Sequence, residues 1–295
     1  MVRTIGRWVL PIGALFILGP IVSVVLNGLR APDGGSDVSL LVGASPALGM
    51  ALGCAMLAAA SMYGLVCTRL LDPRTGTLSA GFMLAWAAWR TGNLAEVYRL
   101  GADTGTLVTL AVEAAIVCSL TLVLCLLIAQ WARQDHRPTP GDLPGPHLAS
   151  LRQLGQLPVL VGVGAGTVVA LVVAHLVAFN PLRGQTLMAG VLGAIAAGAI
   201  SRLVICSMRE GDAPSVAPFA AVLLAATIAP LIGLVAPGGS KLEAAAVAGT
   251  LPGPLVIQPL DWAAGMLIGT PIGLAWSGSA ITRSSQTQRA RKTAS

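Results

Sequence analysis

Four polar residues stand close together in a largely apolar stretch of the chain and are its clearest candidates for chemistry. Arg90, Asn93 and Glu96 end one apolar run, and Glu113 lies inside the next. Arg90 and Glu113 are equally distant from the turn between the runs, so an antiparallel helical hairpin would bring them to one membrane depth. A charge there costs at least about 2.5 to 3.5 kcal/mol, which pairing can offset. We therefore expect an Arg90–Glu113 ion pair.

Two roles for this pair stay open. Glu113 could be a proton or cation site tuned by Arg90, or the pair could be a fixed lock between two helices. Asn93 and Glu96 are three residues apart, on one helical face, and would line the outer mouth of a substrate or ion pathway.

Other chemistry is not encoded by any motif in the sequence. There is no Walker A, HExxH or GxSxG pattern, and the five cysteines lie singly inside apolar runs without a CxxC pair. The positive charge is spread over loops and the C-terminal end, without a soluble module to present it to nucleic acid. We expect no metal, no cofactor and no nucleic-acid partner, and we favour a protein that is not an enzyme.

The composition indicates that lipid is the solvent of this protein. Hydrophobic residues make up 55% of the chain and charged residues 10%, with a mean hydropathy of +0.80, whereas ordinary globular domains carry about 25% charge. Because backbone amides must be paired in hydrocarbon, apolar runs of about 20 residues without alternation predict helices. The expected fold is all-α, a polytopic membrane helix bundle.

About eight runs are long enough to be transmembrane helices. They cover approximately residues 8–29, 46–69, 78–98, 104–131, 157–179, 185–206, 214–236 and 258–281. The third is ambiguous, because its uncharged part is short and the segment could instead lie in the interface. If it spans, 13 of the 18 Lys and Arg residues fall on one side, and the positive-inside rule makes that side cytoplasmic. We therefore expect eight spans in the cell (inner) membrane, with both termini cytoplasmic.

The chain divides into four parts on composition. These are an N-terminal membrane half (1–132), a Pro-rich cytoplasmic linker (133–156), a C-terminal membrane half (157–281) and a basic, disordered tail (282–295). Residues 72–81 resemble residues 180–190, and the two copies would lie on opposite sides of the membrane. The halves could thus be inverted repeats, as in many transporters, although chance similarity is common in a chain this rich in Ala, Gly and Leu.

Small residues and proline indicate how the late helices pack. Gly265, Gly269 and Gly273 recur every four residues, the spacing of close helix crossings in membranes. Pro230 and Pro271 interrupt two apolar runs, and residues 250–259 cannot form a continuous helix. Non-helical backbone at membrane depth either lines a cavity or is covered by protein.

Two functional hypotheses follow. The leading one is a small secondary transporter or permease, and the alternative is a non-catalytic membrane scaffold or an assembly subunit of a larger complex. A water-accessible cavity at Glu113 would separate them. Expected partners are the lipid bilayer, anionic lipid at the basic tail, and either a second copy of the chain or another membrane protein.

Overall fold

The computed structural model describes residues 2–31, 34–36, 38–135, 148–209, 212–236, 238 and 241–294. All regular secondary structure in these residues is helical, so the all-α prediction is confirmed. The N-terminal elements are α1 (Val2–Gly13), η1 (Ala14–Leu18), α2 (Gly19–Ser23), η2 (Val24–Gly28), α3 (Pro46–Leu70), α4 (Pro73–Arg90), α5 (Leu94–Arg99) and α6 (Thr104–Asp135). The C-terminal elements are α7 (Leu148–Leu151), α8 (Leu157–Val177), α9 (Arg183–Met208), α10 (Ala217–Leu231), η3 (Ile232–Leu234), α11 (Leu242–Ala248), η5 (Gly253–Val256) and α12 (Pro259–Ala294).

Six helices among the described residues are long and apolar enough to cross a membrane. They are Ile5–Gly28, Pro46–Leu70, Thr104–Trp131, Leu157–Val177, Arg183–Met208 and Ala217–Leu234. The chain is therefore a multi-pass membrane protein by the length and composition of its helices. Large apolar side chains such as Trp8, Phe16 and Val168 are exposed on the outside of this bundle, as lipid contact requires.

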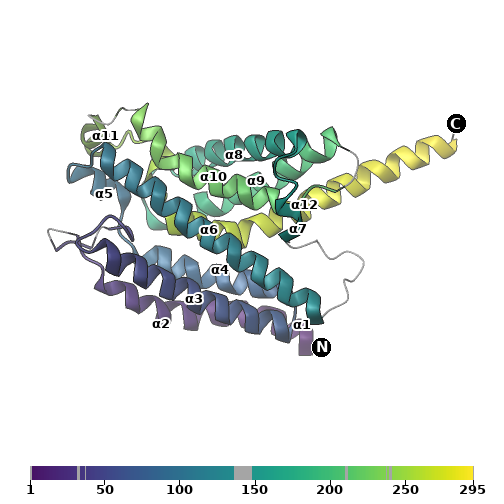
Figure 1. The fold of residues 1–295 in the computed structure, drawn as a ribbon, viewed down its shortest axis with the longest axis horizontal. Helices are drawn as coiled ribbons and strands as arrows, with labels where there is room; N and C mark the ends of the chain where they lie inside the picture. The colour runs from purple at the N-terminus through teal and green to yellow at the C-terminus, as the bar shows by residue number, and fades with distance from the viewer. Residues whose placement is uncertain are drawn as a thin grey trace.

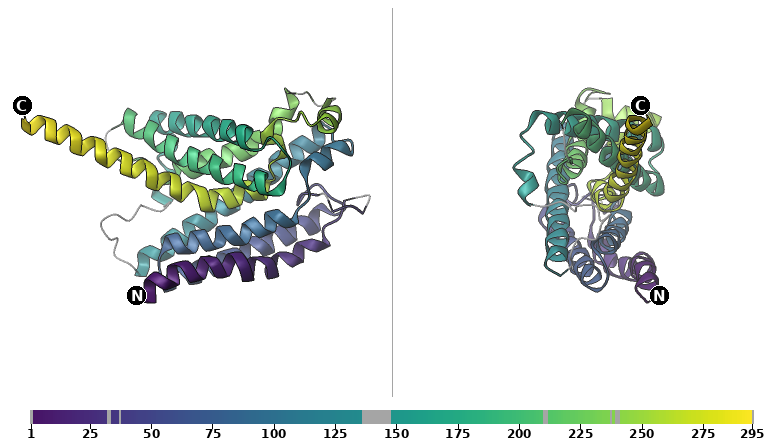
Figure 2. Two further views of the ribbon diagram at one scale, coloured as in Figure 1. Left: turned by 180° about the vertical axis from the view of Figure 1, so that it is seen from behind. Right: turned by 90° about the vertical axis from the view of Figure 1, so that its right-hand side faces the viewer.

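The helices run roughly parallel to the long axis of the molecule in two groups (Figure 1). The first group holds α1 to α4, the second holds α8 to α10, and α6 and α12 lie between them (Figures 1 and 2). In particular, α12 packs against both α9 and α4, and α6 packs against α10, α12 and α3. The short helices α5 and α11 contact each other and lie at the end of the bundle opposite the N-terminus (Figure 1).

The third expected span is divided in the structure. Its helix α4 ends at Arg90, and α5 begins only at Leu94. The break has a local cause, because the Asn93 side chain accepts a hydrogen bond from Ala95 N at 2.9 Å and so starts a new helix as an N-cap.

Two other expected boundaries also differ. Residues 282–294, expected to be a disordered tail, continue α12 as a helix that projects from the bundle (Figure 1). Their Arg, Gln, Ala and Lys residues are good helix formers, and extending an existing helix avoids the cost of nucleation. Residues 133–135 belong to α6 and residues 148–151 to α7, while 136–147 of the expected linker lie outside the described residues.

The first span contains a π-helical turn, η1, shortly before Pro20. In this turn Gly19 N donates to Ala14 O instead of to Leu15 O. The π partner of Leu15 O would be the N–H of residue 20, which proline lacks. The indole N–H of Trp86 on α4 donates to Leu15 O instead. A Cβ at Gly19 would lie 2.5 Å from Trp86 Cδ1, so only glycine leaves room for this contact.

Candidate functional site

Glu113 is buried at 1% exposure, ten residues into α6, and all its hydrogen-bond donors come from the segment before α3. Ser39 Oγ donates to Oε2 at 2.5 Å, Leu41 N to Oε2 at 2.7 Å, and Leu40 N to Oε1 at 3.1 Å. Three donors of this kind can compensate a buried carboxylate without a neighbouring cation.

The prediction that Arg90 and Glu113 form an ion pair is wrong. Within the described chain, no ion pair joins these two side chains. Arg90 is exposed at the end of α4, and its Nε donates to Ser23 Oγ at 3.4 Å. The sequence argument assumed that α4 and α6 form a simple hairpin, whereas the break at 91–93 and α5 separate them, and the 38–44 segment contacts Glu113 instead.

The other two predicted pathway residues lie apart from Glu113. Asn93 is the N-cap of α5, and Glu96 is exposed and pairs with Arg99 Nη1 at 2.6 Å. Within the part of the chain that the structure describes, the hydrogen bonds to Glu113 come from Ser39, Leu40 and Leu41. Asn93 and Glu96 both lie at the end of the bundle formed by α5 and α11.

The 38–44 segment packs into α3 as well as onto Glu113. The buried side chain of Leu40 fits against two glycines of α3, because a Cβ at Gly49 would meet the Leu40 carbonyl and one at Gly53 would lie 2.5 Å from Leu40 Cδ1. Within the segment, Ser39 N donates to Val42 O at 3.0 Å and Val42 N donates to Ser39 Oγ at 3.3 Å. The segment is therefore a closed turn folded down against the bundle.

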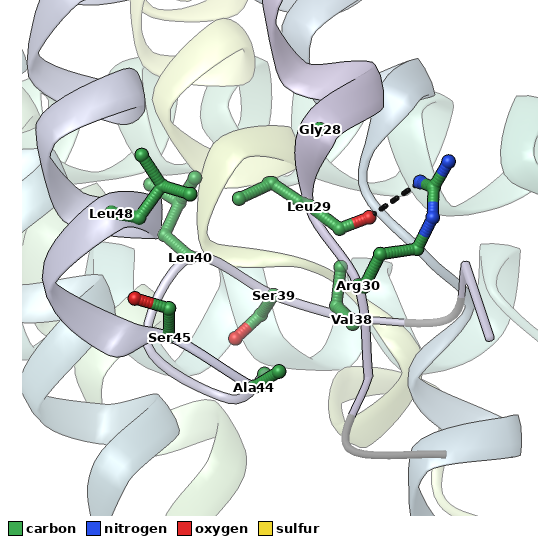
Figure 3. Close-up of a pocket in the computed structure, with 10 residues that line it drawn as sticks. Gly28, Leu29, Arg30, Val38, Ser39, Leu40, Ala44, Ser45 and Leu48 are labelled. Atoms are coloured by element: carbon green, nitrogen blue, oxygen red, sulfur yellow. Dashed lines mark hydrogen bonds between the residues drawn. The ribbon is translucent and has the colours of Figure 1, made fainter. Parts of the chain in front are cut away.

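A cavity of about 190 Å³ lies beside this turn (Figure 3). Its lining residues are Gly28, Leu29, Arg30, Val38, Ser39, Leu40, Gly43, Ala44, Ser45 and Leu48. Leu29 and Leu40 face each other across it, and the Arg30 side chain points away from the turn (Figure 3). Arg30 Nη1 donates to the carbonyls of Asn27 and Leu29, at 2.6 and 2.7 Å. Glu113 is not among the residues that line the cavity.

Gln258 joins three parts of the chain beneath the same end of the bundle. Its buried amide nitrogen Nε2 donates to Gly92 O at 2.6 Å and to Val38 O at 3.4 Å. Gly92 N in turn donates to Val38 O at 2.7 Å. Gln258 therefore fixes the start of the 38–44 segment and the break between α4 and α5.

Asp261 extends this polar layer toward α9. Its carboxylate is 2% exposed and accepts from Gln258 N at 3.1 Å, the return bond of a helix capping box at the start of α12. Thr186 and the Arg183 guanidinium lie close enough to interact with it electrostatically. Arg183 Nη2 lies 3.5 Å from Thr91 Oγ1, next to Gly92.

Sequence reasoning missed Ser39, Gln258 and Asp261. Gln258 and Asp261 had a local signal, since an acidic residue three positions after a helix-starting Gln-Pro is the spacing of a capping box. Ser39 had none, because a serine in a loop gives no indication of a partner 74 residues away.

The glycines of α12 lie directly against α9. A Cβ at Gly265 would meet the carbonyl of Gly190, one at Gly269 the carbonyl of Val191, and one at Gly273 the carbonyl of Ile195. The backbones of α12 and α9 are thus in contact along more than two helical turns. This close packing fixes the position of α12 and therefore of Asp261 at its start.

Residues 250–258 are non-helical except for the short η5, and protein covers them from Gly253 onward. Residues 253–258 are all buried, Tyr98 Oη donates to Leu255 O at 3.0 Å, and Gly253 N donates to His175 Nδ1 at 3.2 Å. His175 thus has a structural partner.

The described residues contain no group of three or more His, Cys, Asp or Glu side chains placed to hold a metal ion. All five cysteines are free thiols, and three of them are buried. What the site can do is hold backbone segments in place through charge-assisted hydrogen bonds. No protein family model, no curated protein and no solved structure matches this chain.

Proposed function

We propose that the protein is a non-catalytic membrane scaffold or assembly subunit. The observation that carries this proposal is the enclosure of Glu113, which is 1% exposed and accepts hydrogen bonds from Ser39, Leu40 and Leu41. The buried core around it is dominated by alanine, and α12 and α9 touch backbone to backbone. A transport pathway needs water or substrate at its polar residues, and a saturated, enclosed carboxylate supports a static role instead.

A cysteine scan along α6 tests this proposal. Thr106 is partly exposed at the start of the helix, and Leu110, Glu113 and Val117 follow on its buried side. Single cysteines at positions 106, 110 and 117 in a chain without its native cysteines would be treated with a water-soluble maleimide. A scaffold predicts reaction at position 106 alone. Reaction at 110 and 117 would reveal a water path past Glu113 and overturn the proposal.

A small permease is the second candidate, because several non-helical segments meet at one end of the bundle. The 38–44 segment, the 91–93 break and the stretch before α12 join through Gln258, beside the cavity at Ser39. Discontinuous backbone at the substrate site is typical of secondary transporters. The reaction of positions 110 and 117 in the scan is the result that favours this candidate.

We further propose eight spans, with α4 and α12 added to the six apolar helices. At about 1.5 Å per residue, the 18 residues of α4 cover about 27 Å, close to the hydrocarbon thickness. With eight spans both termini are cytoplasmic, on the distribution of Lys and Arg. The exposed Trp8 and Trp131 lie toward the N-terminal end of the bundle, where Arg69 stacks on Trp131 at 5.8 Å, as expected of an interfacial belt. Topology reporters fused after Arg152 and Arg291 should both report the cytoplasm, and an outside signal from either would exclude eight spans.

The basic C-terminal end of α12 is proposed to bind anionic lipid. It contains Arg283, Arg289, Arg291 and Lys292, and each positive charge near an anionic surface contributes about 1 kcal/mol. Removing residues 282–295 should leave insertion intact and weaken binding to vesicles that contain phosphatidylserine. Unchanged binding would show that these charges only set topology.

A further inference from the structure

We propose that residues 39–43 form a flap that opens as a unit, with Glu113 as its catch. Such a flap is compatible with both a scaffold and a permease.

The ends of the flap are fixed to the rest of the chain. At one end Val38 O accepts from Gly92 N at 2.7 Å and from Gln258 Nε2 at 3.4 Å. At the other end Ala44 N donates to Arg30 O at 2.8 Å. The five residues between these points have no backbone–backbone bond to any other described segment. They can therefore move without disturbing a helix.

Inside the flap, the turn is closed on itself. Ser39 N bonds to Val42 O, and Val42 N bonds to Ser39 Oγ. These internal bonds do not depend on Glu113, so they survive when the flap lifts. Gly43, adjacent to the fixed Ala44, has no side chain to resist rotation.

Three hydrogen bonds to Glu113, the Leu40 side chain and the packing of Val42 against the apolar cluster of α5, α6 and α11 hold the flap down. The bonds come from Ser39 Oγ, Leu40 N and Leu41 N, and they converge on one carboxylate. Bonds to a charged acceptor are strong, and their loss leaves the carboxylate unpaired. The catch is thus concentrated in one side chain on α6, whereas the flap belongs to the connection between η2 and α3.

Opening would enlarge a space that already exists. Ser39, Leu40 and Gly43 line the 190 Å³ cavity, and so does Leu29, which faces Leu40 (Figure 3). Leu29 and Leu40 are 7% and 1% exposed in the closed state. Both become accessible to water when the flap lifts, and so does Glu113.

The test uses the full-length protein in proteoliposomes, without its native cysteines, with a single cysteine at Leu29 or Leu40. The rate of reaction with a water-soluble maleimide reports the open fraction. Each cysteine is combined with Ser39→Ala, which removes one bond to the catch and also the internal bond from Val42 N, or with Glu113→Gln, which removes the charge of the catch. Glu96→Gln is the matched control, since Glu96 is a glutamate with an exposed side chain that pairs with Arg99.

Ser39→Ala should raise both labelling rates at least about tenfold, the equivalent of one hydrogen bond to a charged acceptor. Glu113→Gln should raise them further, and Glu96→Gln should leave them unchanged. Equal rates in Ser39→Ala and Glu96→Gln would overturn the proposal. So would reaction of the two cysteines in the parent at the rate of a cysteine at the exposed Ser45.

Hydrogen exchange of the unmodified protein gives a second measurement that does not depend on the folding of any variant. The amide protons of Leu40 and Leu41, which are bound to Glu113, should exchange faster than those in the middle of α6. Exchange as slow as in the middle of α6 would show that the flap does not open separately, and would contradict the proposal.

Discussion

Ser39 Oγ lies 2.5 Å from Glu113 Oε2, although 74 residues separate the two in the chain. The deepest charge in α6 is therefore compensated by a hydroxyl and two backbone N–H groups, and Arg90 has no part in this. This relationship determines what happens when either charge is removed.

Glu113→Gln should destabilise the fold by about 2 to 4 kcal/mol, because an amide replaces an acceptor that faces three donors. Arg90→Gln should cost less than about 0.5 kcal/mol, since Arg90 is exposed and makes one long hydrogen bond. The double variant should equal the sum of the two within about 0.5 kcal/mol. The free energy of unfolding in mixed micelles is measured for the parent, the two single variants and the double variant. A larger coupling energy would show that Arg90 and Glu113 do interact.

Trp86→Phe should destabilise the first span by about 1 to 3 kcal/mol, because it leaves Leu15 O without the donor that Pro20 cannot provide. Trp89→Phe is the control. Trp89 lies on the same helix, with its ring 6.4 Å from that of Trp86, but it is half exposed. Unfolding midpoints in detergent compare the two variants. A similar effect of both would mean that ring packing, and not the indole N–H, stabilises the π turn.

The features of the fold and of the site that could be predicted from the sequence are those set by residues close together in the chain. Six of the eight apolar runs, the interruption before α12 and the spacing of Gly265, Gly269 and Gly273 are properties of neighbouring residues, and each of these has a counterpart in the structure. The partners of Glu113 are mainly backbone amides, which every residue has, so side-chain types could not indicate them. The prediction for Arg90 assumed that two residues equally far from a turn lie side by side in a helical hairpin. It was wrong because α6 packs mainly on α10, α12 and α3.

Gly269→Ala should destabilise the protein by about 1 to 3 kcal/mol, because the new Cβ would overlap the Val191 carbonyl and push α12 away from α9. Gly164→Ala is a control of the same chemistry within a helix, since a Cβ at Gly164 has nothing within 4 Å. It should be neutral, or stabilising by up to about 1 kcal/mol through helix propensity. The free energy of unfolding of the two variants in one detergent tests the pair, and equal losses would argue against close packing at Gly269.

Asp103 gives the start of α6 a pH dependence of defined sign. The backbone N–H and the hydroxyl of Thr106 donate to Asp103 Oδ1 at 2.8 and 2.9 Å, and these bonds hold the pKa of the carboxyl below its ordinary value. Because the pKa is lowered in the folded state, the stabilisation is complete above the unfolded pKa of about 3.9 and is lost as the pH falls through the lower, folded value.

Thr106→Val removes the hydroxyl bond and should raise the pKa of Asp103 toward the ordinary value. The carboxyl carbon signal of Asp103, followed by NMR from pH 6 to pH 2, should therefore titrate at higher pH in Thr106→Val than in the parent. An unchanged Asp103 titration would show that the backbone N–H groups alone set its pKa.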